Sequence, residues 1–551
     1  MTQTNWSQFG TAYGDLEART LTLDNVDTWL HDWSELEKEL EERFATLQRA
    51  KDEDTRDEAA EEAYLAFLHE VLPASETASQ QLKVKLLGLE GYTPDPEHEE
   101  LIKRFRNEVE LFREENAALL AQEAALSSEY NKLMGGLTVH LDGETLTIPK
   151  AQKKLLEPDR ALRERAWQAV NEAKLSVSSE LDELFLKLLE LRRQIAENAE
   201  LDYRGFSWRR WNRFDYTPEE SLALHRSIAG EVVPLAAKLC EERQREMSLP
   251  ALRPWDRGVD PQARAPLEPF ETVAELEEGL VRIFRRLDPE LAAQFSSLRD
   301  GWLDLESREG KVPGLGYQNF FPKQKKPYIY HSVNQTHGDV TVLVHEAGHA
   351  FHSLASVARN DLVWNFYPGM EFAEVASQTM ELLMLPYLER SEGGFYSEED
   401  AARAKREGLE RVILLLPYLA KSDAFQHWLY AEAPEDVSVA DMDAKWLELE
   451  ERFDPGVDWS GLERERAKGW HDFHIFAVPF YMLEYAYAWL GAIQIWQNAL
   501  ADPQGALQKY RAALALGGTR PLPELFETAG ARFAFDRETV GELMRFVYSQ
   551  R

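Results

Sequence analysis

Residues 340–355 read Val-Thr-Val-Leu-Val-His-Glu-Ala-Gly-His-Ala-Phe-His-Ser-Leu-Ala, a mostly apolar run that carries a few polar side chains. Two histidines, His345 and His349, stand four residues apart, and Glu346 follows the first directly. Residues i and i+4 lie on the same face of an α-helix. The apolar flanks predict that this helix is buried, where His and Glu side chains without partners would be costly. We therefore expect the polar face of the helix to have a specific partner.

The spacing of these polar residues is that of a zinc site. Two imidazoles at i and i+4 can bind one Zn²⁺, and the glutamate between them can hold the attacking water. With 13 histidines in 551 residues, a chance pair at this spacing is expected about 0.3 times, and the added glutamate lowers that to a few hundredths. The alternative is an ordinary helix with two polar residues on its face. The pattern predicts metal-assisted hydrolysis, with a peptide bond as the expected target.

A third metal ligand is expected downstream, because catalytic zinc sites usually have three protein ligands and one open position. Residues 370–385 form a strongly apolar stretch of helical character that contains Glu371, Glu374 and Glu381. Glu374 and Glu381 are seven residues apart and share one helix face. We expect Glu374 to be the third ligand and Glu381 to orient a ligand histidine. The alternative, a solvated edge, fits the apolar flanks poorly.

Residues 339–352 and 371–378 together resemble the thimet oligopeptidase and oligoendopeptidase F family of zinc metallopeptidases. In that family the third zinc ligand lies twenty-five residues after the second histidine, which in this chain is Glu374. Thermolysin-like and aminopeptidase-like zinc enzymes have a shorter gap. The resemblance is dense from about residue 311 to 496 and diffuse before about residue 192.

The resemblance also assigns substrate-binding residues near the end of the dense region. In the family, a histidine followed by tyrosines on the next helix faces the zinc, binds substrate and steadies the oxyanion. His474, Tyr481 and Tyr485 match these residues. Tyr481 and Tyr485 are four apart, so both hydroxyls are expected in one cleft. Ala488 and the long interval before Tyr481 depart from the thimet branch, so the oligoendopeptidase F side fits better; a core role for each tyrosine is the alternative.

Composition excludes some partners. A net charge of −35 and a pI near 4.9 argue against nucleic acid and anionic membrane, because both would repel the chain. The single cysteine, Cys240, excludes an internal disulfide and suits a reducing cytosol. Residues 1–20 lack an apolar signal region, and no run approaches eighteen apolar residues. We expect a cytoplasmic protein with no membrane span.

The remaining sequence reads mostly as helix. Helical periodicity covers residues 36–50, 57–72, 101–130 and 160–198. Alternation around Asp142-Gly143 predicts a hairpin over residues 137–148. Further predictions are a loop rich in Arg and Trp over residues 203–216, a flexible stretch at 313–316 and a strand at 327–331. The family resemblance and this run together predict that the strand receives an extended peptide as an added edge strand.

The family resemblance implies a two-lobed, mostly helical shell around a deep channel, with a small sheet beside the zinc helix. We divide the chain into an N-terminal helical region (1–195) and a helical zinc peptidase region (196–551). A narrow channel would exclude folded proteins and admit only short peptides.

The predicted function is that of a zinc-dependent endopeptidase with one Zn²⁺ per chain, cleaving internal bonds of short peptides. Glu346 would be the general base, and His474, Tyr481 or Tyr485 would stabilise the oxyanion. One alternative is a zinc carboxypeptidase, which needs a cationic group for the substrate's terminal carboxylate. Another is a non-catalytic peptide-binding protein, which would be expected to lack Glu346 or one of the ligands.

Overall fold

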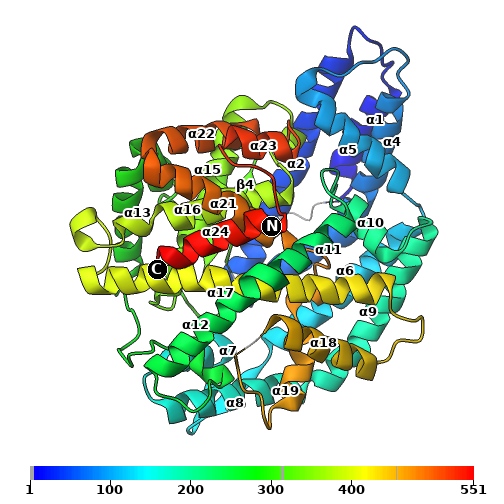
Figure 1. Ribbon diagram of the computed structural model, residues 1–551. Helices are drawn as coiled ribbons and strands as arrows, with labels where there is room; N and C mark the ends of the chain where they lie inside the picture. The colour runs from blue at the N-terminus through cyan, green and yellow to red at the C-terminus, as the bar shows by residue number, and fades with distance from the viewer. Residues whose placement is uncertain (1–4, 312–315, 455) are drawn as a thin grey trace.

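The computed structural model describes residues 5–311, 316–454 and 456–551 and is mostly helical (Figure 1). The first half contains α1 (Ser7–Ala18), α2 (Val26–Glu53), α3 (Glu58–Ala66), α4 (Leu72–Leu87), α5 (Glu99–Leu111), α6 (Asn116–Gly135), α7 (Ile148–Lys153), α8 (Arg160–Ser176), α9 (Ser178–Asn198), α10 (Tyr203–Arg210), α11 (Pro218–Ser227) and α12 (Val233–Glu246). The second half contains α13 (Val273–Leu287), α14 (Pro289–Ser296), α15 (His337–Arg359), α16 (Met370–Leu383), α17 (Glu398–Ala431), α18 (Val439–Phe453), α19 (Glu463–Ala467), α20 (Phe473–Phe476), α21 (Leu483–Ala501), α22 (Pro503–Leu516), α23 (Leu522–Thr528) and α24 (Arg537–Ser549).

Two large hydrophobic cores hold most of the helices. The smaller core is built from residues of α1–α5, among them Trp29, Trp33 and Phe105, and is joined by Leu362. The larger core begins in α6 and continues to α24. Figure 1 shows α1, α4 and α5 gathered at one end of the molecule, away from α12 and α13, while α17 runs across the body. The predicted two-lobed helical fold is thus confirmed, and the boundary near residue 195 stays a prediction.

Most of the predicted helices are present with adjusted ends. Residues 36–50 lie within α2, and 57–72 cover α3 and a π-helical turn that leads into α4. Residues 101–130 and 160–198 are each divided between two helices, α5 and α6 in one case and α8 and α9 in the other. The predicted loop at 203–216 is wrong over its first half, which is α10. The Asp202 side chain caps this helix at the Gly205 N–H.

The predicted hairpin is β1 (Thr138–Leu141) paired antiparallel with β2 (Glu144–Thr147). Asp142 and Gly143 have φ values of 50° and 87°. Positive φ at both central residues is what a two-residue hairpin turn requires, and Asp-Gly accommodates it. The hairpin, α7 and α8 share a small core of their own that includes Val139, Ala151 and Val170.

A second, three-stranded sheet lies beside α15. It consists of β3 (Leu303–Asp304), β4 (Gly316–Phe321) and β5 (Lys326–His331), in the order β3-β5-β4. The predicted strand at 327–331 is therefore β5, in the middle of the sheet, and β3 and β4 are the edge strands. Of the stretch 313–316, residues 313–315 lie outside the described residues, and Gly316 begins β4.

The helices that carry the predicted ligands are packed closely together. Helix α15 begins with a capping box between Thr336 and Asp339 and runs for 23 residues. It contacts α16 at Gly348, where an added Cβ would lie 2.6 Å from the Ser377 Cα. Only glycine allows this approach of the two backbones, so Gly348 fixes how α15 and α16 face each other. In the described part of the chain, no helix is both long enough and apolar enough to cross a bilayer.

Candidate active site

The three predicted metal ligands come together at the α15–α16 contact. The ligand atoms of His345, His349 and Glu374 all lie within 4.8 Å of one another. Glu374 Oε2 is 3.3 Å from His345 Nε2 and 3.8 Å from His349 Nε2. The histidines come from adjacent turns of one helix and the carboxylate from the helix that Gly348 brings close. The packing of α15 on α16 thus aims two nitrogens and one oxygen at a single point.

Each histidine also has a hydrogen-bond partner outside the three ligands. His345 Nδ1 lies 2.8 Å from Glu381 Oε1, and the second oxygen of Glu381 pairs with Arg411 of α17. His349 has the backbone of Ala373 as its hydrogen-bond partner. A proton held at Nδ1 leaves the Nε2 lone pair free for a metal ion. The sequence prediction for Glu381 agrees with this geometry, whereas Arg411 could not be found from sequence.

The electrostatics of the cluster favour an ionised carboxylate. Burial opposes ionisation of Glu374, but the hydrogen bond from His345, the two imidazoles and the Tyr481 hydroxyl lower its pKa to about 2. Burial also lowers the pKa of His349 to about 4, which keeps this imidazole neutral. Metal binding requires neutral imidazoles and a carboxylate. Glu374 and His349 have these protonation states, whereas, despite its burial, the contacts with Glu374 and Glu381 raise the pKa of His345, so a metal ion would have to displace a proton from this imidazole.

The donor set fits a zinc ion. Tetrahedral zinc with bonds of about 2.0–2.1 Å separates neighbouring ligand atoms by about 3.3 Å. The distances of 3.3 and 3.8 Å between Glu374 Oε2 and the two Nε2 atoms are close to that value. Two histidines and one carboxylate also form a recognised catalytic zinc set with an open fourth position. His345, His349 and Glu374 would hold the ion, and no large movement is needed.

Glu346 lies in the same cavity as the cluster and is only 7% exposed. Burial raises the pKa of its carboxyl to about 7, although the neighbouring His345 lowers it. The backbone N–H of Gln318 in β4 is a hydrogen-bond donor to this group. A carboxyl with such a pKa can both accept and return a proton near neutral pH.

Tyr481 and Tyr485 line the cavity, but they come from different local structures. The Tyr481 hydroxyl donates to Glu374 Oε1 at 2.8 Å, and its ring meets that of Tyr485 edge to face at 5.5 Å. The expectation that both lie on one helix is wrong, because α21 begins only at Leu483. His474 stacks on Tyr481 with ring centres 6.4 Å apart and contacts Asp472 through Nδ1. His474 thus packs against both tyrosines, with its ring centre 6.0 Å from that of Tyr485, and the described lining of the cavity does not include it.

The turn that carries Tyr481 is held from outside by a side chain that sequence analysis did not identify. Phe480 has a φ of 61°, unusual for a residue with a Cβ. Arg213, which is 7% exposed, donates to the Phe480 carbonyl and to Glu484. The Trp211 indole N–H donates to the Pro479 carbonyl at 3.2 Å. The only sequence signal for these residues was the density of Arg and Trp before residue 216.

The cavity has a volume of about 370 Å³. It is lined by Gly316–Phe320, His345, Glu346, His349, His352, Ser353, Phe366–Pro368, Met370, Ala373, Glu374, Tyr481 and Tyr485. Among these described lining residues there is neither a lysine nor an arginine. The strand along the cavity is β4, not β5, so the expectation that residues 327–331 receive a peptide is wrong: β5 already has β3 and β4 as its neighbours. The edge strand that lines the cavity is β4.

Known proteins resemble this chain in sequence and in fold. Residues 155–544 match the family described as Peptidase family M3. An "Oligoendopeptidase F homolog" of Borreliella burgdorferi is 25% identical over 236 residues, which cover 41% of this chain and 38% of that relative. The matched segment is thus well under two thirds of that relative's length.

Solved structures match nearly the whole chain. An X-ray structure described as oligoendopeptidase F has a TM-score of 0.92 and 26% identity, and the match covers 99% of this chain and 97% of that one. PZ peptidase A with an inhibitor has a TM-score of 0.92 at 24% identity, covering 99% and 98% of the two chains. A protein described as oligoendopeptidase F from Bacillus anthracis has a TM-score of 0.88 at 22% identity, covering 100% and 96%. The last two likenesses, below 25% identity, show the fold.

Proposed function

The chain belongs to peptidase family M3, and on this premise we propose that it is a zinc-dependent endopeptidase that cleaves internal bonds of short peptides. The observation that carries the proposal is the cluster of His345, His349 and Glu374 with Glu346 in the same cavity. The relatives named as oligoendopeptidase F support the same activity. One zinc ion per chain is proposed, held by the three clustered residues.

The proposed chemistry divides between the ion and the side chains. A zinc ion in this site supplies a Lewis acid that lowers the pKa of water and polarises the scissile carbonyl. Glu346 takes the proton from the attacking water and delivers it to the leaving amine. Tyr481 and Tyr485 are placed to donate hydrogen bonds to the oxyanion, and His474 supports the ring of Tyr481. Such preorganised donors stabilise charge that develops only in the transition state.

The lining of the cavity favours an endopeptidase over a carboxypeptidase. A carboxypeptidase binds the terminal carboxylate of its substrate next to the scissile bond, which calls for an Arg or Lys there. The described lining residues include neither. A non-catalytic peptide-binding protein is also disfavoured, because Glu346 and all three ligands are present.

The proposed substrates are short peptides. A cavity of about 370 Å³ inside a helical shell supports this, because it has room for a short peptide segment. The net charge of −35 disfavours nucleic acid and anionic membrane as partners. A cytoplasmic location is part of the proposal, supported by the single cysteine, which suits a reducing compartment.

Cleavage of an internally quenched peptide that is blocked at both termini tests the proposal. We expect internal cleavage that a chelator abolishes and added zinc restores. Cleavage that requires a free carboxylate on the residue just after the scissile bond would favour the carboxypeptidase. Binding of the peptide without cleavage would favour a peptide-binding protein.

A further inference from the structure

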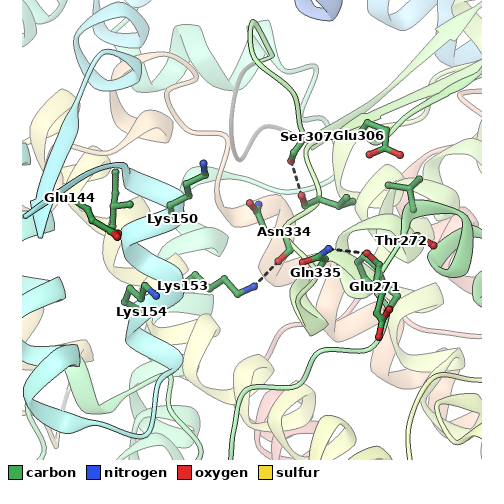
Figure 2. A pocket seen from close by; sticks show the side chains of 14 residues that line it. Glu144, Lys150, Lys153, Lys154, Glu271, Thr272, Glu306, Ser307, Asn334 and Gln335 are labelled. Atoms are coloured by element: carbon green, nitrogen blue, oxygen red, sulfur yellow. Dashed lines mark hydrogen bonds between the residues drawn. The ribbon is translucent and has the colours of Figure 1, made fainter. Parts of the chain in front are cut away.

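A second cavity, of about 620 Å³, lies outside the catalytic one (Figure 2). Its walls come from the β1–β2 hairpin with α7, from the segment after β3, and from the loops that lead into α13 and α15. Figure 2 shows Lys150, Lys153 and Lys154 on one side, with Glu271, Glu306 and other polar residues on the opposite side. None of these residues has a part in the chemistry proposed above.

The lysines lie on one short helical segment. Lys150 and Lys153 are in α7, Lys154 begins the 3-10 turn that continues it, and all three line the cavity. Ala151, between them in sequence, is buried in the small core of the hairpin and α8, which fixes the orientation of this segment. Three cations within five residues also contrast with the net charge of −35 of the chain.

Two of the three lysines have no anionic partner among the described residues. Lys153 Nζ donates to the Asn334 carbonyl at 2.9 Å and lies 3.6 Å from Glu268, so it ties α7 to the loop before α15. No salt bridge joins Lys150 or Lys154 to any residue that the structure describes. These two ammonium groups are available to an anionic ligand in the cavity.

The second cavity begins where the edge strand of the catalytic cavity ends. Gly316, which lines the catalytic cavity, pairs with His331 of β5. Val333, two residues beyond His331, lines the second cavity. At about 3.3 Å per extended residue, this step is only about 7 Å. The two cavities are thus neighbours at one end of the sheet.

The antiparallel pattern of β4 gives a direction to a bound peptide. A peptide added antiparallel to the free edge of β4 would run parallel to β5, from Lys326 towards His331. Its C-terminal part would leave β4 at Gly316 and approach the second cavity. Gln335, which lines the second cavity, lies just before α15, and His345 is in the third turn of that helix. The helical rise places the two residues about 12–15 Å apart, a distance that about four or five extended peptide residues cover.

We propose that the second cavity binds the C-terminal carboxylate of the peptide substrate through Lys150 and Lys154. The inference rests on the proposed function, because it takes the substrate to be a peptide cut at the metal cluster. The distance between this cavity and the metal cluster would then set the cleavage position relative to the C-terminus, and the released C-terminal fragments would have about four or five residues. An acidic side chain at the same position offers the same carboxylate chemistry.

The test compares three quenched peptides with five residues after the scissile bond: a free acid, its amide, and an amide that ends in glutamate. We expect wild type to prefer the free acid over the amide by about tenfold in kcat/KM. In the double variant K150A/K154A this preference should fall to about twofold or less. The control K187A removes an exposed lysine of α9 and should keep the wild-type preference. Equal cleavage of the free acid and the amide ending in glutamate would support the carboxylate site and include side chains as its ligands.

A binding measurement separates this inference from the proposed function. The five-residue product, as free acid and as amide, is titrated into wild type and K150A/K154A, so that no catalysis is needed. Tighter binding of the free acid that is lost in the double variant supports the site even if no peptide is cleaved. Cleavage with the same preference in wild type and K150A/K154A, or no effect of amidation on binding, would overturn it.

Discussion

Substitution of Gly348 by alanine tests whether the contact between α15 and α16 sets the metal site. A Cβ at this position would lie 2.6 Å from the Ser377 Cα and 2.9 Å from the Ala376 carbonyl oxygen. Ordinary contact begins at 3.4 Å. The first distance is thus 0.8 Å too short, and the neighbour is backbone, which has no rotamer to change. The two helices would have to move apart by a comparable amount.

That displacement separates the ligands. His349 follows Gly348 on α15, and Glu374 lies one turn before Ser377 on α16. Metal–ligand distances tolerate changes of only about 0.2 Å. We therefore expect G348A to weaken zinc binding by about 10–100-fold. Overpacking should also lower the free energy of unfolding by about 1–3 kcal/mol.

The matched control is Gly408→Ala in α17. No atom lies within 4 Å of a Cβ there, and alanine is the better helix former by about 1 kcal/mol. Zinc affinity is measured by competition with a chromophoric chelator, and stability by denaturant unfolding of the metal-free proteins. G408A should keep wild-type affinity. Wild-type zinc affinity in G348A, with or without a loss of stability, would refute the argument.

Three further predictions concern single side chains. Glu346→Gln should keep one zinc per chain and lose about 10²–10⁴-fold in kcat. Metal analysis and single-turnover kinetics check this. A variant that keeps wild-type turnover would show that Glu346 is not the base. Tyr481→Phe should lose about 10²–10³-fold in kcat. The control Tyr487→Phe removes a buried hydroxyl without a described partner and should keep the wild-type kcat. Equal kcat values for the two variants would contradict the oxyanion role of Tyr481. Glu123, whose pKa is about 2 because its pairing with buried Arg192 and another arginine outweighs burial, should stabilise the protein above about pH 4.5 and cease to do so as pH falls towards 2. Unfolding titrations should show a smaller acid dependence in E123Q and a loss of about 3–5 kcal/mol at pH 7; an unchanged pH profile would contradict the pairing.

Sequence alone could predict what rests on local pattern. The His345-Glu346 motif and the apolar periodicity around it predict a buried helix with a polar face, and α15 has this form. The Asp142-Gly143 pair predicts the hairpin because its turn needs two positive φ values. Glu374 was identified through its place in an apolar stretch and through the family resemblance. In the first two cases, residues close in sequence carry the information, and in the third it comes from the spacing that the family has.

The parts that were missed depend on contacts between distant segments. Phe480 has a φ of 61°, which is not helical, and α21 begins only at Leu483, so Tyr481 lies outside the helix. The sequence of that segment does not predict this conformation, because the Phe480 carbonyl is held by Arg213, more than two hundred residues earlier in the chain. The strand order β3-β5-β4 likewise depends on tertiary contacts, and it leaves β4 at an edge and buries β5 in the middle of the sheet. Periodicity cannot reveal either one.

The central claim is that a single zinc ion is held by His345, His349 and Glu374 in a cavity built for peptide hydrolysis. Anomalous diffraction at the zinc edge from crystals of the zinc-loaded protein tests it most directly. The account predicts one strong peak per chain, about 2.0–2.2 Å from His345 Nε2, His349 Nε2 and a Glu374 oxygen. A peak at other residues, or none at this cluster in crystals of zinc-loaded, active protein, would contradict it.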